Sequence, residues 1–259
     1  LFKFPDGASW RMMKGTTRYL LTGTVALLLG LAVLVYKYMG KHSTSLQQNG
    51  EWVVLLHGIL RGPGSMDKIQ KALEHRGYHV LNFGYPSTSE SIADSADLLS
   101  REIKKLPSGS KINFVTHSMG AIVVRYYLAN YREASASRFV MIAPPNRGSS
   151  LAKRLAGFPL FKRILGRAGV ELAKTNSSLI ENLPPLRCEF GVIAGGLGNG
   201  SGLNPLIPGD DDMTVSVEET KLPGMKDFIQ IRGQHSLLLL QQEVADNVIS
   251  FLEKGIFLH

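Results

Sequence analysis

The chain has 259 residues, of which 44% are hydrophobic and 19% are charged, and its formal net charge is +8. This composition indicates a globular protein with room for one α/β domain and a sizeable core. The single cysteine, Cys188, excludes an internal disulfide, and no cluster of Cys and His has the spacing of a metal site. The basic residues are scattered, which suits an anionic membrane surface better than a nucleic acid.

Residues 19–36 form a long apolar stretch without a charge. Together with its neighbours it approaches the roughly 20 residues that a helix needs to cross a bilayer. A cationic excess before the stretch favours a cytoplasmic N-terminus, with the main domain on the non-cytoplasmic side. A cleaved signal peptide is the alternative, but Val35–Met39 offers no small-residue cleavage site. The length of the run disfavours a buried core helix, so we predict a single-pass anchor.

The chain is predicted to divide into three parts. Residues 1–41 hold a cytoplasmic stub and the membrane anchor, residues 42–50 form a polar linker, and residues 51–259 form an α/β domain. The chain begins with Leu1, so we expect either a non-standard start codon or a natural start further along the chain. A start at Met12 or Met13 would leave a compact basic segment before the anchor.

Strands and helices alternate within the α/β domain. Apolar runs predict strands at Glu51–Leu56, Tyr78–Phe83, Lys111–Thr116, Arg138–Ala143, Arg187–Ala194 and Asp227–Arg232. Helical patterns occur at Ser65–Arg76, at Ser91–Lys105, after Ser118 and in a long final run from Leu237 to Glu253. This alternation predicts a mostly parallel sheet with helices on both faces, and functional residues at the carboxyl ends of the strands.

Ser118 lies between an apolar strand and a helical run, in the segment T-H-S-M-G that begins at Thr116. A sharp strand-to-helix turn of this kind, the nucleophile elbow, projects the serine Oγ out of the backbone. The N–H groups and the positive dipole end of the following helix then face a developing oxyanion. Thr116 replaces the first glycine of the usual G-x-S-x-G pattern. We predict Ser118 as a nucleophile.

A serine hydroxyl needs a neighbouring base, and histidine suits this role because its ordinary pKa is close to neutrality. His235 follows the last predicted strand and begins the last predicted helix, so we predict it as the base. The alternative is a helix-capping or loop histidine. His57 is interpreted as a structural residue that holds the turn after the first strand. His117 is next to Ser118, and its side chain is expected to point elsewhere.

The base in turn needs a carboxylate to fix its tautomer and to stabilise the imidazolium. Three consecutive aspartates, residues 210–212, lie between Ser118 and His235, which gives the chain order Ser, Asp, His. We predict Asp212, because the run that follows it would hold it rigidly, and Asp211 is the second choice. A solvated acidic loop or a calcium site is the alternative interpretation.

Two backbone N–H groups are predicted to form an oxyanion hole. One belongs to Met119, directly after the nucleophile, and the other to Ile59, in the turn after the first strand. Gly58 would let the backbone bend so that the N–H of Ile59 faces the serine.

These segments together resemble the lipase/esterase branch of the α/β-hydrolase superfamily, and most closely its bacterial lipase-like members. The resemblance is carried by V-L-L-H-G-I-L-R-G, H-S-M-G-A, A-P-P-N-R-G-S, L-N-P-L-I-P-G-D-D-D-M-T-V and G-Q-H-S-L-L. It implies an α/β-hydrolase fold from about Glu51 to Phe251, with Ser118, Asp212 and His235 as a catalytic triad. Met213 departs from the pattern, because many relatives have glycine after the acid.

Residues 148–182 interrupt the alternation with helical stretches, at the place where a cap over the active site would be inserted. Residues 151–165 mix apolar and cationic side chains, as surface-seeking amphipathic segments do. The segment is interpreted either as a lid that contacts acyl chains or lipid, or as a helical insert that packs on the domain.

The predicted function is hydrolysis of carboxylic esters, by an esterase or lipase that forms an acyl-enzyme and needs no cofactor or metal. The expected partners are an ester or lipid substrate and the membrane, not a nucleic acid. A thioesterase, amidase or acyltransferase would use the same triad. A non-catalytic binding protein on a hydrolase fold is the remaining alternative.

Overall fold

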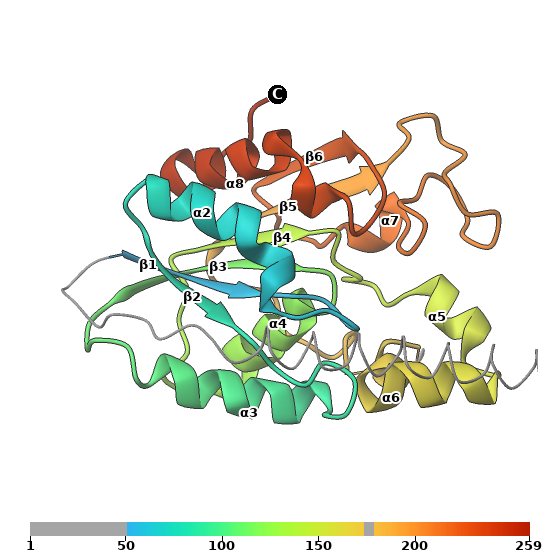
Figure 1. Ribbon diagram of the computed structural model, residues 1–259, viewed down its shortest axis with the longest axis horizontal. Helices are drawn as coiled ribbons and strands as arrows, with labels where there is room; N and C mark the ends of the chain where they lie inside the picture. The colour runs from blue at the N-terminus through green and yellow to red at the C-terminus, as the bar shows by residue number, and fades with distance from the viewer. Residues whose placement is uncertain (1–50, 174–178) are drawn as a thin grey trace, which may run out of the picture. The chain divides into compact units, whose positions relative to one another are not determined.

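The computed structural model describes residues 51–173 and 179–259 (Figure 1). The predicted anchor at residues 19–36, the linker at 42–50 and the expected start at Met12 or Met13 lie outside the described residues. In the part of the chain that is described, every helix is too short or too polar to span a lipid bilayer.

Six parallel strands form one sheet in the order β2-β1-β3-β4-β5-β6. The strands are β1 (Glu51–Leu56), β2 (His79–Phe83), β3 (Lys111–His117), β4 (Arg138–Ile142), β5 (Glu189–Gly196) and β6 (Asp227–Arg232). Their ends differ from the predicted ones by at most two residues, and the predicted parallel sheet is confirmed. The order reverses next to β1, because β2 lies on one side of β1 and β3 on the other.

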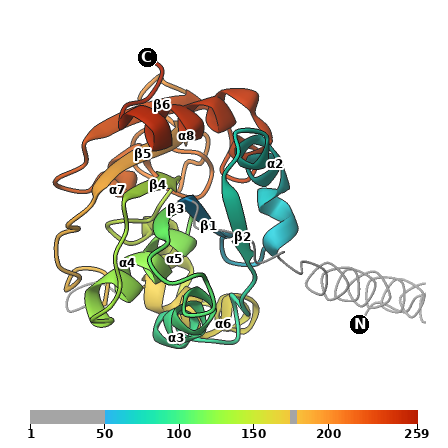
Figure 2. The same ribbon diagram turned by 90° about the vertical axis from the view of Figure 1, so that its left-hand side faces the viewer.

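Helices cover both faces of the sheet, as predicted (Figures 1 and 2). One face carries α2 (Asp67–His75) and α8 (Gln242–Lys254), and the other carries α3 (Ile92–Ile103) and α4 (Gly120–Asn130). Side chains alternate along β1, so they divide between the two faces of the sheet. Val53 and Leu55 pack on the α8 side, and Val54 and Leu56 pack on the α4 side. All four are fully buried, as expected for a central strand of a parallel sheet.

The predicted long final helix is in fact two elements. A short 3₁₀ helix, η2 (Leu238–Leu240), precedes α8, and Gln241 between them is extended, with ψ of 137°. The side-chain Nε2 of Gln241 donates a hydrogen bond to the carbonyl of Arg232 at the end of β6, over 3.0 Å. A single helix would break this contact, which ties the segment after His235 to the sheet. A similar short element, η1 (Pro63–Met66), precedes α2.

The insertion after β4 contains two helices, α5 (Ser150–Leu155) and α6 (Pro159–Ala173), in the region predicted as a helical cap. They lie beyond the carboxyl ends of the strands (Figure 1). Gly166 interrupts α6 with a φ of +59°, and a Cβ at this position would lie 1.9 Å from the carbonyl oxygen of Thr88. The kink therefore lets α6 pack closely on the loop after β2, where the N–H of Arg167 donates to the same carbonyl.

Two glycines allow α4 to begin directly against the turn after β1. A Cβ at Gly120 would lie 2.8 Å from the carbonyl oxygens of Leu56 and His57, and a Cβ at Gly58 would lie 2.9 Å from the Cβ of Ser118. These separations are below van der Waals contact, so a larger residue at either position must displace backbone. This close approach fixes the position of the strand-to-helix turn around Ser118.

His57 holds the turn after β1, as predicted. Its Nδ1–H donates to the carbonyl of Gly58 over 2.9 Å, and its Nε2 accepts from the backbone N–H of Tyr85 over 3.4 Å. The ring of Tyr85 stacks on the imidazole, and its hydroxyl donates to the carbonyl of His57. Burial lowers the pKa of His57 from 6.5 to about 4. His57 is therefore neutral and structural at neutral pH.

Replacement of Gly120 by alanine should lower the free energy of unfolding by about 1–3 kcal/mol, the usual cost of overpacking a tight site. Chemical denaturation followed by circular dichroism measures this change. Gly62→Ala is the matched control, since a Cβ there meets nothing within 4 Å and its φ of −132° suits any residue. Equal stability of the two variants would contradict the close approach at Gly120.

The neutral state of His57 makes stability depend on pH. Between pH 6.5 and about 4 the unfolded chain binds a proton at this residue and the folded chain does not. The effect of His57 on the free energy of unfolding is therefore constant above pH 6.5. Below that pH the free energy of unfolding falls by about 1.4 kcal/mol per pH unit until the folded state also binds the proton. His57→Asn should reduce this slope by about one proton, in urea titrations across the window. His75→Asn, at an exposed position, is the matched variant for the loss of one histidine. An unchanged slope in His57→Asn would refute the assignment.

Candidate active site

Ser118 lies on the turn between β3 and α4 with a φ of +53°, in the left-handed region that residues with a Cβ seldom adopt. Its N–H donates to the carbonyl of Ile142 at the end of β4 over 2.9 Å, and its carbonyl accepts from Ala121 in the first turn of α4. The strained turn is thus held from the sheet and from the helix. The geometry is that of the predicted nucleophile elbow.

Four non-glycine residues have a positive φ among the described residues: Leu60, Ser118, Ala143 and Met213. Leu60 follows β1, Ser118 follows β3, Ala143 follows β4, and Met213 lies in the long connection after β5. Strain of this kind persists where the surrounding structure enforces it, and it concentrates at functional sites. Here it gathers at the carboxyl edge of the sheet.

Thr116, which takes the place of the first elbow glycine, is fully buried. It pairs with Leu56 in β1 and with Met141 in β4. Its Oγ1 has no hydrogen-bond partner within the described residues. The threonine therefore fits the elbow sterically, while its hydroxyl gains nothing from the site.

His235 and Asp212 form a buried pair at the same edge of the sheet. The Nδ1–H of His235 donates to Oδ2 of Asp212 over 2.7 Å, and the backbone N–H of His235 donates to the carbonyl of Asp212 over 2.8 Å. Asp212 is fully buried and His235 is 8% exposed. With Nδ1 engaged, Nε2 is the ring nitrogen that is left to exchange a proton with another group.

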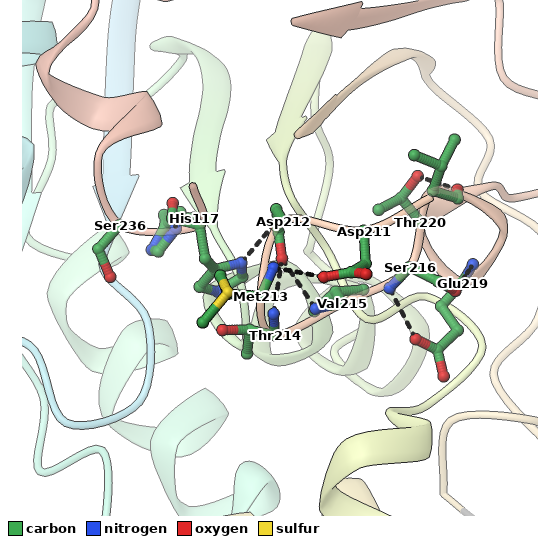
Figure 3. A network of polar contacts seen from close by, with 12 residues as sticks. His117, Asp211, Asp212, Met213, Thr214, Val215, Ser216, Glu219, Thr220 and Ser236 are labelled. Atoms are coloured by element: carbon green, nitrogen blue, oxygen red, sulfur yellow. Dashed lines mark hydrogen bonds and ion pairs between the residues drawn. The ribbon is translucent and has the colours of Figure 1, made fainter. Parts of the chain in front are cut away.

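Backbone N–H groups hold the carboxylate of Asp212 in this orientation (Figure 3). Its Oδ1 accepts from Thr214 over 3.0 Å and from Val215 over 2.8 Å, which leaves Oδ2 for His235. The apolar run after the aspartates thus supplies the rigid support that the sequence predicted for Asp212.

The other two aspartates of the run do not reach His235. Asp211 accepts hydrogen bonds from the N–H groups of Leu203, Asn204 and Met213, at 2.7–3.1 Å. Asp210 instead accepts from two N–H groups that follow β5 and from the side chain of Gln230. The geometry therefore favours the first choice, Asp212, over the second, Asp211. In the described part of the chain, no group of three or more Asp, Glu, His or Cys residues could hold a metal ion.

Met213 has a φ of +83°. This conformation favours glycine, which accounts physically for the glycine that many relatives have after the acid. The backbone of Met213 is fixed on both sides, because its N–H donates to Asp211 and its carbonyl accepts from Asn204. These contacts hold the strained residue in place.

His117 contributes to the site in a way that the sequence analysis missed. Its Nε2–H donates to the backbone carbonyl of His235 over 3.0 Å, and the two rings lie 4.6 Å apart. Complete burial holds the pKa of His117 well below its ordinary value, so its ring is neutral. Strand alternation was the available signal, since His117 faces the same side as Val115, the side of α8 on which His235 lies.

The predicted oxyanion-hole residues flank the elbow. Met119 is the N-cap of α4, and Ile59 lines a cavity together with Ser118. Within the described residues, neither backbone N–H donates to another protein group. Ile59 lines the cavity at Ser118, whereas Met119 is fully buried and is not among the residues that line it.

Ser118 opens into a cavity of about 270 Å³ between the sheet and the two helices of the cap. Apolar side chains from the cap make up much of its wall: Leu151, Ala152, Leu155, Ile164, Leu165 and Leu172. Thr214 and Val215, whose N–H groups hold Asp212, line it as well. The cavity therefore joins the serine to the loop of the Asp212–His235 pair.

Ser118 and His235 do not share a hydrogen bond within the described residues, and neighbouring residues connect them instead. His117 directly precedes the serine and bonds to the backbone of His235, while the side chain of Ser236 accepts from Arg61 in the turn after β1. Catalytic hydrogen bonds are often long in a ligand-free site.

Solved structures with a similar fold are esterases and phospholipases. The phospholipase PlaB from Legionella pneumophila aligns over 67% of this chain, with 18% identity and a TM-score of 0.54. The match spans only 45% of the phospholipase chain. An esterase from Thermogutta terrifontis aligns over 82% of this chain and 93% of its own, with 17% identity and a TM-score of 0.55. A metagenomic carboxyl esterase aligns over 76% of this chain and 68% of its own, with 22% identity and a TM-score of 0.51.

These likenesses confirm the α/β-hydrolase fold that the sequence motifs implied. No protein with a curated description matches the sequence significantly. The model of one protein family, described as a domain of unknown function (DUF7379), matches residues 36–171, which is more than half of the 259 residues. The chain therefore belongs to the DUF7379 family, and its described domain has the α/β-hydrolase fold.

Proposed function

We propose that the chain is a serine hydrolase that cleaves carboxylic esters. The observation that carries this proposal is the buried Asp212–His235 pair, joined at 2.7 Å, at the same edge of the sheet as the strained Ser118. A histidine held through Nδ1 by a carboxylate and a serine on a strand-to-helix turn are the two parts that acyl transfer needs. The esterases of similar fold add support of a general kind.

In the proposed reaction, Oγ of Ser118 attacks the ester carbonyl carbon while Nε2 of His235 takes the hydroxyl proton. The negative charge that develops on the carbonyl oxygen is held by the N–H groups of Ile59 and Met119. The alcohol leaves with the proton from His235, and an acyl-enzyme remains on Ser118. Water then attacks this ester, with His235 again as the base, and the acid is released.

Asp212 keeps its charge throughout this sequence and stabilises the imidazolium that forms on His235. Its second oxygen is already satisfied by the N–H groups of Thr214 and Val215, so the carboxylate needs no reorganisation during turnover. His117 acts as a positioning residue, because its hydrogen bond holds the backbone of His235.

The apolar cavity favours a substrate with a short acyl chain. Its volume of about 270 Å³ lies just below the usual range for small-molecule pockets, roughly 300–1,000 Å³. Its cap residues supply apolar surface and few polar groups, which suits a hydrocarbon chain better than a charged acid. We therefore propose that the cap binds the acyl chain.

We also propose that residues 19–36 attach the chain to a membrane.

Ser118→Ala should abolish ester hydrolysis, because it removes only the nucleophile. We expect kcat to fall by roughly 10⁴- to 10⁶-fold in assays of the full chain with p-nitrophenyl esters from acetate to palmitate. The parent should prefer the short esters. Ser110→Ala, at the opposite edge of the sheet, is the control and should keep the parent rate.

Equal rates of ester hydrolysis for Ser118→Ala and the parent would refute the ester hydrolase proposal. Thioester, amide and acyl-acceptor substrates would then be assayed, because the same machinery would serve them. Labelling of Ser118 by a serine-directed phosphonate separates these activities from a non-catalytic binding protein. A chain that neither turns over a substrate nor takes up the label is not a serine hydrolase.

Asp212→Asn and Asp211→Asn should have different effects. The first should lower kcat by about 10⁴-fold with the fold intact, since the amide favours the wrong tautomer of His235. The second should lower the melting temperature and retain most of the activity of the folded protein, since Asp211 holds loop N–H groups instead. Steady-state kinetics and thermal unfolding of both variants give the comparison. Greater loss of kcat in folded Asp211→Asn would reassign the acid.

A further inference from the structure

A second cavity, of about 600 Å³, lies at the C-terminal end of α4. Residues 128–132, 134–136 and 184–188 provide most of its lining, and Arg125 lines it from within the helix. It shares no lining residue with the cavity at Ser118. The two are therefore separate sites, and an inference about the second does not depend on ester hydrolysis. We call it the arginine cavity.

Three arginines line this cavity, Arg125, Arg132 and Arg187, and none of its described lining residues is acidic. Arg132 and Arg187 are exposed. Neither forms an ion pair with a described residue. The carboxylates of Glu133 and Glu189, which are close in sequence, pair with Lys104 and with Arg138. The lining thus has three basic side chains and no acidic one, while the carboxylate of Asp97 reaches it only through the hydroxyl of Tyr131.

Arg125 is the buried member of the three, with only 4% of its surface exposed. Its Nη1 donates to the backbone carbonyl of Asn146 over 3.1 Å and to the side-chain Oδ1 of the same residue over 3.2 Å. Its Nε is buried and has no partner within the described residues. Burial lowers the pKa of Arg125 to about 10, with no carboxylate to oppose the effect, so the guanidinium stays charged at neutral pH.

A buried cation without an anion is costly, and proteins normally pair such a group. A guanidinium also presents N–H groups in a planar fork that matches phosphate and carboxylate oxygens. Three cations without acids suit a group with more than one negative charge, and a phosphate monoester carries about −1.5 to −2 at neutral pH. The volume exceeds that of a phosphate group alone, and Leu128, Pro185 and Leu186 give the remaining space an apolar wall.

We propose that the arginine cavity binds a phosphate monoester, with the phosphate on the three arginines and the organic part on the apolar wall. The ligand could be a soluble phosphorylated molecule or the headgroup of a phosphatidic acid. The phosphate chemistry is common to both.

The first test is binding by the full chain in neutral detergent micelles, with thermal unfolding followed by tryptophan fluorescence. Inorganic phosphate is one ligand, phosphatidic acid added to the micelles is the other, and sodium chloride controls for ionic strength. A site that binds only the folded protein gives a saturable rise in melting temperature. A general salt effect of phosphate would not saturate and would be equal in all variants.

Arg132→Gln/Arg187→Gln removes two exposed arginines of the cavity, so the fold should be retained. We expect the apparent affinity for the phosphate ligand to fall roughly tenfold or more, because charge-assisted hydrogen bonds are lost. Arg76→Gln/Arg232→Gln is the charge-matched control on exposed arginines outside the cavity, and its affinity should equal that of the parent. Absence of saturable binding in the parent, or equal weakening in both double variants, overturns the proposal.

Cys188 locates the bound ligand, because it lines the arginine cavity and is the only cysteine of the chain. Burial raises the pKa of its thiol to about 11, so alkylation is slow and is followed with excess reagent at a pH below the pKa of Arg125. Saturating phosphate should slow this alkylation in the parent and in the control double variant, but not in Arg132→Gln/Arg187→Gln. Unchanged alkylation in the presence of either ligand places binding elsewhere and overturns the assignment. Protection by inorganic phosphate identifies a soluble ligand, and protection by phosphatidic acid alone identifies a lipid headgroup.

Discussion

Gly58 and Gly120 lie where the turn after β1 meets the first turn of α4, and the space between these two segments has no room for a Cβ. The close approach sets the distance between the sheet and the helix. It also holds the turn that carries Ser118 against the segment that contains Gly58 and Ile59. The cap and the cavity are built around this arrangement. A displacement of a few tenths of an ångström here would shift the turn that carries Ser118, because packed interiors transmit strain.

The loop after β5 holds acidic side chains that form no ion pair with a lysine or arginine among the described residues. Each of its three consecutive aspartates accepts hydrogen bonds from backbone N–H groups, and the three carboxylates turn in different directions. Hydrogen bonds to a charged acceptor are strong and directional. The hydrogen bonds of Asp211 close the loop on itself, and those of Asp210 join the loop to the end of β5 and to β6. Asp212 keeps one oxygen for His235, so the shape of the loop decides which carboxylate meets the imidazole.

Much of this fold could be predicted from the sequence, since apolar runs and turn residues marked all six strands. The choice of Asp212 over Asp211 rested on the stiff apolar run that follows, and the structure shows that run holding its carboxylate. The break at Gln241 was not predictable, because it depends on a carbonyl at the end of β6 that only the folded sheet brings near. The burial of Arg125 was not predictable either, because a single cation in an apolar helix normally faces water.

The left-handed residues at the carboxyl edge of the sheet have a consequence for how the protein responds to heat. Leu60, Ser118, Ala143 and Met213 each carry a conformational cost of about 1 kcal/mol or more, which the surrounding contacts offset. The central strands β1, β3, β4 and β5 contain no left-handed residue outside glycine, and most of their residues are buried. Local opening is easiest where strain is stored and packing is thin. On warming, the loops around the serine should therefore rearrange before the sheet melts, and thermal inactivation should begin below the melting temperature of the domain.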